Sequence, residues 1–334
     1  MRFYRLLLPL LSAILLLSSC KKELNVNADW TETMVVYGLL DQTLDTNYIK
    51  ITKAFLGPGN AIDFAKIADS SQYKNTLEVR LDEYSDGAYL RSINLDTITI
   101  HNKQAGDSVF YFPEQQLYYT TEKLNQNHLY KLFIKNPVTG KVVTSETRLV
   151  HDFEIFRPQS QASFPPGFNF QVKWAQAKEG KRYQLLIRFH YIEFQKSNPS
   201  VSEVKHIDWI LFNNIKSPDV ATVQPFDLYF PADGFYAVVA SRIAPNPNVT
   251  RNAWYCDFIF TVAAADLNTY MEVTEPTLSL VQEKPTFTNI KEGDKDQVGL
   301  FSARFSKHQT DTLFVSQITR DALKTNPLTK DLGF

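Results

Sequence analysis

The sequence has 334 residues, with 35 Lys and Arg against 36 Asp and Glu, so its charge is nearly balanced. It contains no basic stripe or arginine cluster of the kind that neutralises phosphates, which excludes nucleic acid as a partner. Aromatic residues are abundant, with 24 Phe and 16 Tyr against 12 Gly, a composition typical of β-sheets packed face to face.

Residues 1–19 have the three zones of an export signal. Arg2 and Arg5 form the positive region, an apolar run extends from Leu6 to Leu17, and two serines follow it. The apolar run has twelve residues, whereas a helix needs roughly 20 to span a bilayer. The segment is therefore predicted to be a cleaved signal peptide and not a membrane anchor.

The next residue, Cys20, is predicted to carry the lipid of a lipoprotein. Residues 17–20, Leu-Ser-Ser-Cys, resemble a lipobox, in which the cysteine becomes the first mature residue and is acylated on its thiol. The alternative is an ordinary signal peptide with an incidental cysteine. Two or more acyl chains hold a protein stably at a membrane, so residues 20–32 are expected to be a lipid-anchored linker.

The residues after Cys20 bear on location. Lys21 and Lys22 follow it and no Asp stands in the next position, which favours the outer membrane over retention at the inner membrane. Glu23 weakly matches a surface-export tag, so the cell surface is favoured over the periplasmic side, which stays open.

Residues 33–155 are predicted to form an N-terminal β-sandwich domain. Short runs of β-branched and aromatic residues alternate with polar ones and are separated by turn residues. Residues 60–73 are predicted to form a short helix or an ordered loop. The expected strands cover residues 34–40, 48–55, 76–84, 89–95, 109–111, 118–119, 129–136 and 142–149.

A proline-rich stretch over residues 151–168 is interpreted as a domain junction. Residues 156–334 are predicted to form a C-terminal β-sandwich-like domain with Trp174 in its core, and helices are expected at 264–273 and 316–324. The predicted fold is thus all-β: two immunoglobulin- or fibronectin-like sandwiches with one or two short helices. The expected strands cover residues 168–174, 183–193, 204–213, 227–230, 236–243, 253–263, 300–306 and 311–315.

No catalytic or metal site is predicted. With Cys20 acylated, Cys256 is the one remaining thiol, and its strand context predicts a buried small hydrophobe. No nucleophile elbow or phosphate-binding glycine loop occurs, and no cofactor is expected. Paired carboxylates of a glycoside hydrolase stay an open alternative, because such partners lie far apart in sequence. The six histidines are scattered and lack zinc-site spacing: His101, His128, His151, His190, His206 and His308.

Several local motifs are interpreted as ordinary structural features and not as functional sites. His190 to Glu193 resembles half of a metallopeptidase motif but is predicted to be strand. The acidic segments 41–45, 69–71 and 292–297 are interpreted as solvated loops, with calcium as the alternative. Aromatic residues that could form a carbohydrate or peptide platform are expected more often in the core: Phe110, Tyr111, Phe112, Tyr118, Tyr119, Trp209 and Trp254.

The lipobox at 17–20, the segment Met-Val-Val-Tyr-Gly-Leu-Leu at 34–40, Phe-Thr-Asn-Ile at 287–290 and Gly-Leu-Phe-Ser-Ala at 299–303 occur in a recognisable order. Together they resemble a family of uncharacterised Bacteroidota outer-membrane lipoproteins, a domain of unknown function whose members are often found beside TonB-dependent transporters. The resemblance implies that 287–303 completes the sheet of the second domain. No catalytic residue carries over from it.

The function expected from these features is that of a non-enzymatic, lipid-anchored surface protein. It would bind a ligand or partner a TonB-dependent outer-membrane barrel in nutrient uptake, and would be a monomer apart from that partner. The alternatives are a glycan-binding module or degradative enzyme, and a structural surface protein or adhesin.

Overall fold

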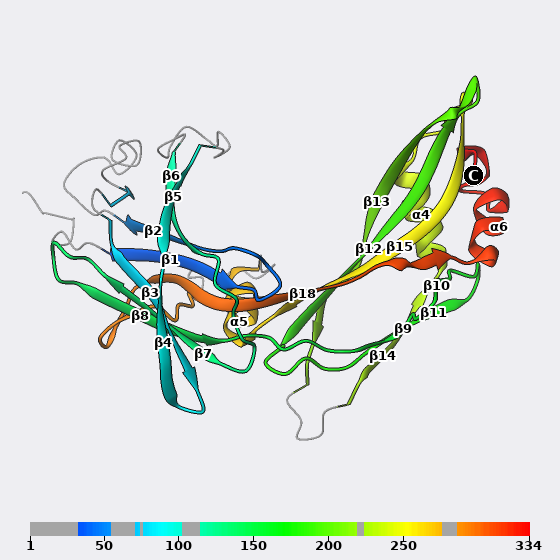
Figure 1. Ribbon diagram of the computed structural model, residues 1–334. Coiled ribbons are helices and arrows are strands. Elements are labelled where there is room, and N and C mark those ends of the chain that lie inside the picture. The colour runs from blue at the N-terminus through cyan, green and yellow to red at the C-terminus, as the bar shows by residue number, and fades with distance from the viewer. Residues whose placement is uncertain (1–32, 55–70, 74–75, 102–113, 219–223, 276–285) are drawn as a thin grey trace, which may run out of the picture.

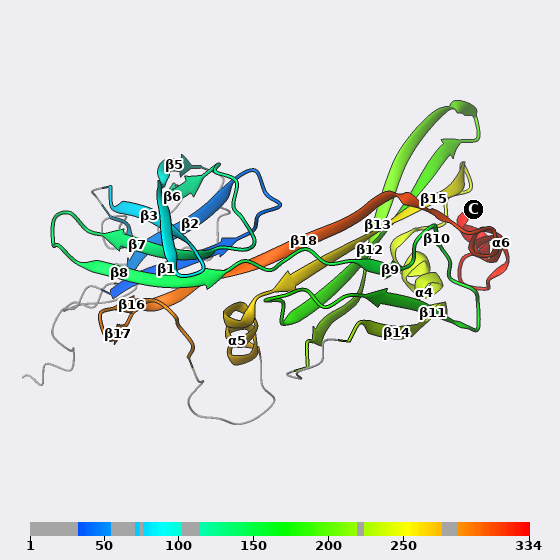
Figure 2. The same ribbon diagram turned by 60° about the horizontal axis from the view of Figure 1, so that its bottom comes forward.

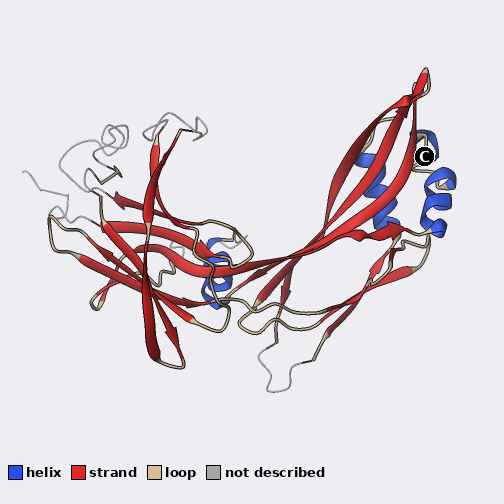
Figure 3. Ribbon diagram, in the orientation of Figure 1, coloured by secondary structure: helices blue, strands red, loops and turns tan. Residues whose placement is uncertain are grey.

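The computed structural model describes residues 33–54, 71–73, 76–101, 114–218, 224–275 and 286–334. Strands cover 55% of the chain and helices 13%, which confirms the predicted all-β class. Figure 1 shows two β-rich halves at the two ends of an elongated molecule, and Figure 3 shows that the helices flank the sheets. In the described part, no helix is long and apolar enough to cross a membrane.

The N-terminal half contains two antiparallel groups of strands. The first group joins β1, β2, β6 and β5 in that order, and the second joins β17, β16, β8, β7, β3 and β4. The buried side chains of both groups belong to one hydrophobic core. The strands are β1 (Thr33–Leu40), β2 (Asn47–Ala54), β3 (Glu78–Ser85), β4 (Ala88–Asn94), β5 (Asp96–Ile100), β6 (Gln115–Thr120), β7 (Leu129–Lys135), β8 (Val142–Arg148), β16 (Lys291–Glu292) and β17 (Lys295–Asp296).

The predicted period-two alternation is present in these strands. In β7, Tyr130, Leu132 and Ile134 are buried while the residues between them are partly exposed. β5 was not predicted, since Asp96–Ile100 is nearly all exposed and lacks an apolar face. The predicted strand at 109–111 and most of the predicted helix or loop at 60–73 lie outside the described residues.

The C-terminal half packs a long-stranded sheet against a smaller sheet and a helix. The large sheet has the order β13-β12-β15-β18, with β10 also beside β18, and the small sheet has the order β14-β11-β9. Trp174 is fully buried, as predicted, and its ring stacks on Phe212 and Phe226 at centroid distances of 5.4 and 4.7 Å. The strands are β9 (Ile155–Arg157), β10 (Gln161–Ala162), β11 (Asn169–Trp174), β12 (Arg182–Gln195), β13 (Asn198–Lys216), β14 (Phe226–Pro231), β15 (Val249–Ala263) and β18 (Val298–Val315).

One strand joins the two halves. The start of β18 pairs in parallel with β1, Val298 opposite Val35, and its later part pairs antiparallel with β15, Phe314 opposite Tyr255. Figure 2 shows this strand running from one half into the other. The expectation that residues 287–303 complete the sheet of the second domain is therefore wrong. Residues 298–303 pair with β1, and Lys291 pairs with Thr144 of β8, and both of these strands belong to the N-terminal half. The predicted strands at 300–306 and 311–315 are one continuous strand.

Three α-helices lie in the described part: α4 (Asp233–Arg242), α5 (Ala265–Thr274) and α6 (Gln317–Thr325), followed by a 3-10 turn, η1 (Lys330–Leu332). α5 and α6 were predicted within a residue. The predicted strand at 236–243 is wrong, because α4 occupies it. Its aromatic and β-branched residues suit a strand locally, but as a helix it buries Phe235, Tyr236 and Val239 in the core of the C-terminal half.

Candidate functional site

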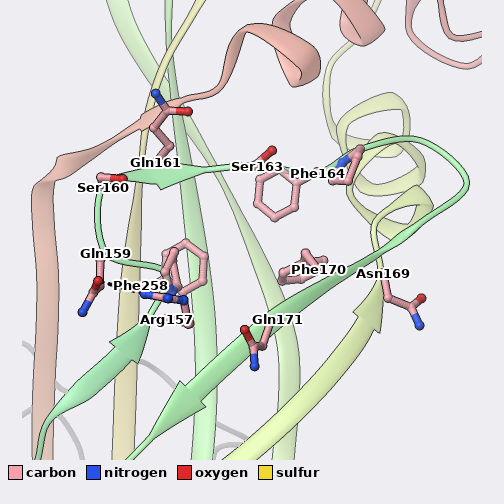
Figure 4. A pocket seen from close by; sticks show the side chains of 12 residues that line it. Arg157, Gln159, Ser160, Gln161, Ser163, Phe164, Asn169, Phe170, Gln171 and Phe258 are labelled. Carbon is pink, nitrogen blue, oxygen red and sulfur yellow. Dashed lines mark hydrogen bonds between the residues drawn. The ribbon is translucent and has the colours of Figure 1, made fainter.

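The C-terminal half contains a cleft of about 520 Å³, formed mainly by residues 157–171 and Phe258 of β15. Figure 4 shows the side chains that line it, which come from β10, β11, the turns beside them and Phe258. Phe164, Phe170 and Phe258 supply apolar surface and are almost entirely buried. Phe164 meets Phe170 edge to face at a centroid distance of 5.0 Å.

The rim of the cleft is polar and carries no acid among the described residues. Its neutral side chains come from Gln159, Ser160, Gln161, Ser163, Asn169 and Gln171. These amides and hydroxyls can both donate and accept hydrogen bonds. The cleft therefore combines an apolar floor with a ring of neutral hydrogen-bonding groups.

Arg157 is the charged residue in the cleft lining. Its Nη1 donates to the Phe156 carbonyl oxygen at 3.2 Å and to Oε1 of Gln159 at 2.8 Å. The peptide bond between Arg157 and Pro158 is cis. The nearest strand, β11, places Lys173 opposite Arg157, and Lys173 donates to Asp227 at 2.8 Å. Asp227, the acid beside this part of the cleft, is thus already paired with Lys173.

The wall of the cleft is held by hydrogen bonds to other elements. The Phe164 amide donates to Oγ1 of Thr319 in α6 at 2.7 Å, and the Tyr236 hydroxyl of α4 donates to the Phe164 carbonyl at 2.5 Å. On the other side, Nε2 of Gln309 donates to the Pro158 carbonyl at 3.1 Å. These contacts fix the loop from both ends, so the cleft is formed before any ligand arrives.

The cleft lacks the groups that acid–base chemistry needs. Ser160 and Ser163 are in its lining, but the described lining contains no histidine and no carboxylate to take a proton from them. The Ser163 hydroxyl accepts a hydrogen bond from Ser316 at 2.9 Å. The described lining thus offers hydrogen-bonding groups to a ligand.

The predicted site residues are dispersed in the structure. Cys20 lies outside the described residues. Cys256 is fully buried, as predicted, and this burial raises the pKa of its thiol. His190 pairs with Asp257, Nε2 to Oδ2 at 2.8 Å, and its ring lies 5.6 Å from that of His206. Among the described residues, no group of three or more histidine, cysteine or acidic side chains could hold a metal ion.

The acidic segments have mixed outcomes. Asp41 is fully buried, so interpreting it as part of a solvated loop was wrong: its Oδ1 accepts from the Thr43 amide at 2.9 Å and closes a turn. In the 292–297 segment, Glu292 pairs with Lys141 at 3.0 Å, and most of the segment is exposed, as expected of a solvated hairpin. Asp69 and Ser70 lie outside the described residues.

Of the four aromatic platform candidates that the structure describes, Tyr118 is core, Trp209 packs against the core, and Tyr119 and Trp254 are partly exposed. Tyr118 is buried and its hydroxyl accepts from the Leu77 amide at 2.9 Å. Trp209 packs on Phe164 and on Phe235 of α4. Trp254 is 37% exposed, while residues 110–112 lie outside the described part.

The outer face of the large C-terminal sheet is amphipathic. It exposes Val204, Ile210, Trp254 and Phe314, each more than a third accessible to water. Between them lies a polar group in which Arg188 binds Asp208 through two hydrogen bonds, at 2.7 and 2.9 Å.

Sequence reasoning missed the cleft, because the 151–168 stretch was interpreted only as a junction. The available signal was the run of Gln and Ser side chains at 159–163 directly before Phe164 and two prolines. Asn169, Phe170 and Gln171 repeat the mixture of amide and aromatic side chains on β11. Nothing in that pattern states that the two segments face each other.

Comparisons with known proteins assign this chain to no family. No protein-family model matches the chain, and no curated protein matches it. Among solved structures, the chain was aligned with the crystal structure of CBD12 from CALX1.2 at 10% sequence identity, over 82% of this chain and all of that chain, with a TM-score of 0.15. A TM-score this low carries no argument about function.

Proposed function

We propose that this chain is a lipid-anchored, non-enzymatic binding protein of the outer membrane or cell surface, which captures a small ligand in the cleft of its C-terminal half for nutrient uptake. The observation that carries the proposal is the cleft itself, with phenylalanines below and neutral amides and hydroxyls around the rim. Ligand sites are typically concave, about 300–1,000 Å³ in volume, apolar and edged by a few placed polar groups. The cleft falls within this range of volume, and polar side chains edge it.

The alternatives are less well supported. A glycoside hydrolase needs two carboxyl groups about 5 to 10 Å apart across its substrate, whereas the described lining of this cleft has none. A structural adhesin needs no preformed cleft. A glycan-binding module differs from the main proposal only in the chemistry of its ligand.

The anchor is the second part of the proposal. Cys20, as the acylated first residue of the mature chain, would hold the protein at the membrane by several acyl chains. The exposed Val204, Ile210, Trp254 and Phe314 on one sheet face support a membrane-protein partner, such as a TonB-dependent barrel. In this scheme the cleft collects the ligand and the partner imports it.

Ligand capture is tested on the soluble Cys20→Ala chain by calorimetry against neutral and acidic sugars and short peptides. Ser160→Trp places a large ring in the rim of the cleft, and Asn198→Trp places the same ring at the tip of the β12–β13 hairpin. We expect saturable binding that Ser160→Trp abolishes and Asn198→Trp preserves. Binding that survives both substitutions would locate the ligand elsewhere.

Anchoring and partnership are tested in the native envelope. The wild-type chain should sediment with membranes, and Cys20→Ala should appear in the soluble fraction. A pull-down in mild detergent should retain an outer-membrane barrel with the wild-type chain, and this barrel should be lost from a Val204→Glu, Ile210→Glu double variant. A wild-type protein that always elutes alone argues against the partner.

A further inference from the structure

The hydrogen bonds of Arg157 leave one edge of its guanidinium group unused. Nη1 makes both observed bonds, to the Phe156 carbonyl and to Gln159. Among the residues that the structure describes, no acceptor is paired with Nε or Nη2. These two N–H groups form the parallel fork that binds a carboxylate through two hydrogen bonds. Gln159 thus orients the guanidinium group of Arg157, and the edge formed by Nε and Nη2 has no partner among the described residues.

The charge balance of the cleft favours an anion. The described lining contains Arg157 and no Asp or Glu. Lys173, opposite Arg157 in the pairing of β9 with β11, is matched by Asp227, which also accepts from Gln171 at 2.6 Å. Arg157 therefore faces the cleft without a counter-ion. Calcium and other cationic ligands would meet repulsion there.

The remaining lining indicates what the anionic group is attached to. Ser160, Gln161 and Asn169 offer both donors and acceptors, which suits a ligand bearing several hydroxyl groups. Phe170 and Phe258 back this lining from the core, where they are almost fully buried. A molecule with one anionic group and several hydroxyls is an acidic sugar.

We propose that the cleft selects a carboxylated saccharide, with the carboxylate on Nε and Nη2 of Arg157 and the sugar hydroxyls on the polar side chains of the rim. This inference rests on the proposed function and names the ligand class of the same site. A sugar phosphate would present its anion to the same fork, so the carboxylate and the phosphate are distinguished by experiment.

The test is calorimetry at low salt on the Cys20→Ala chain with four probes: galacturonic acid, galactose, galactose 6-phosphate and N-acetyl-dialanine. We expect galacturonic acid to bind at least 10-fold more tightly than each of the others. Arg157→Gln should remove this preference, so that galacturonic acid and galactose bind the variant with equal affinity. Arg157→Lys keeps the charge but loses the fork, and should restore only part of the preference.

Arg188→Gln is the matched control, because Arg188 is also a partly exposed arginine, but it lies on the outer face of the large sheet. It should bind galacturonic acid like the wild-type chain. Equal affinity for galactose and galacturonic acid, both lost in Ser160→Trp, would overturn the acidic-sugar proposal and keep the binding function. Preference for the phosphate or the peptide would also overturn it. If no probe binds, or Ser160→Trp binds normally, the proposed function of the cleft fails as well.

Discussion

Arg251 and Glu193 form an ion pair inside the C-terminal half, with Nε of Arg251 2.9 Å from Oε2 of Glu193 and side chains that are 5% and 9% exposed. The same guanidinium donates to the Leu332 carbonyl and, at 3.2 Å, to the Ala244 carbonyl. One side chain therefore links β12, β15, the segment after α4 and the C-terminal turn. The pair holds the end of the chain against the sheet.

Arg251→Met should destabilise the protein by about 3 kcal/mol, because it leaves the buried Glu193 with only Lys205 as a charged partner. The control is Arg188→Met, whose pair with Asp208 is about one-third exposed. That pair should contribute less than about 1 kcal/mol. Urea denaturation of both variants measures the difference. Equal losses would show that burial does not set the strength of these pairs.

We predict that Glu83 makes the free energy of unfolding sensitive to acid. Burial raises the pKa of this carboxyl, but hydrogen bonds from Tyr130, Arg91 and His128 outweigh that effect and lower the pKa to about 2. A pKa that is lower in the folded state gives stability that is present above about pH 4.5 and is lost as the pH falls toward 2. The loss should reach about 3 kcal/mol at most.

The measurement is urea unfolding of wild type and Glu83→Gln between pH 5 and pH 2.5. The variant should be less stable at pH 5 and should lose less stability as the pH falls to 2.5, because it has no carboxylate to protonate at this site. Circular dichroism at pH 7 checks that its fold is intact. Parallel pH curves for the two proteins would refute the assigned role of Glu83.

Gly299 should tolerate no side chain. Its φ is +125°, and a Cβ there would lie 1.8 Å from the carbonyl oxygen of Val36 on β1. Gly299→Ala should cost about 3 kcal/mol or more, through backbone strain and forced separation of β1 from β18. Gly140→Ala is the control: its φ is +73° but no atom lies within 4 Å. It should cost only about 1–2 kcal/mol. Thermal unfolding compares the two, and similar losses would contradict the steric argument.

Cys256 should not react with thiol reagents in the folded protein. It is fully buried, and that burial raises the pKa of its thiol, so little thiolate forms and reagents have no access. A thiol-reactive dye added to the Cys20→Ala chain should give background labelling in buffer and one label per chain in guanidinium chloride. Rapid labelling of the native protein would mean that β15 opens readily.

The sequence bears differently on the proposed lipid anchor and on the proposed ligand site. The prediction of Cys20 as the lipid attachment site rests on three adjacent zones of one short segment, so it needs no tertiary structure. The cleft depends on Phe164 before β11, Phe258 in β15 and Thr319 in α6, which are brought together only by folding. Its residues have no diagnostic spacing along the chain, and this is why the cleft was missed.

The sequence by itself determined the all-β class, most strands, the helices α5 and α6, the burial of Trp174 and the burial of Cys256. These features follow from local alternation and composition, which record how each residue meets solvent. The tertiary structure decided that residues 233–242 form a helix, that β18 pairs with both halves, and that Arg157 lines a cleft whose described lining contains no acid. Those properties depend on which surfaces meet in space, and distant segments of the chain supply the contacts that outweigh local preference.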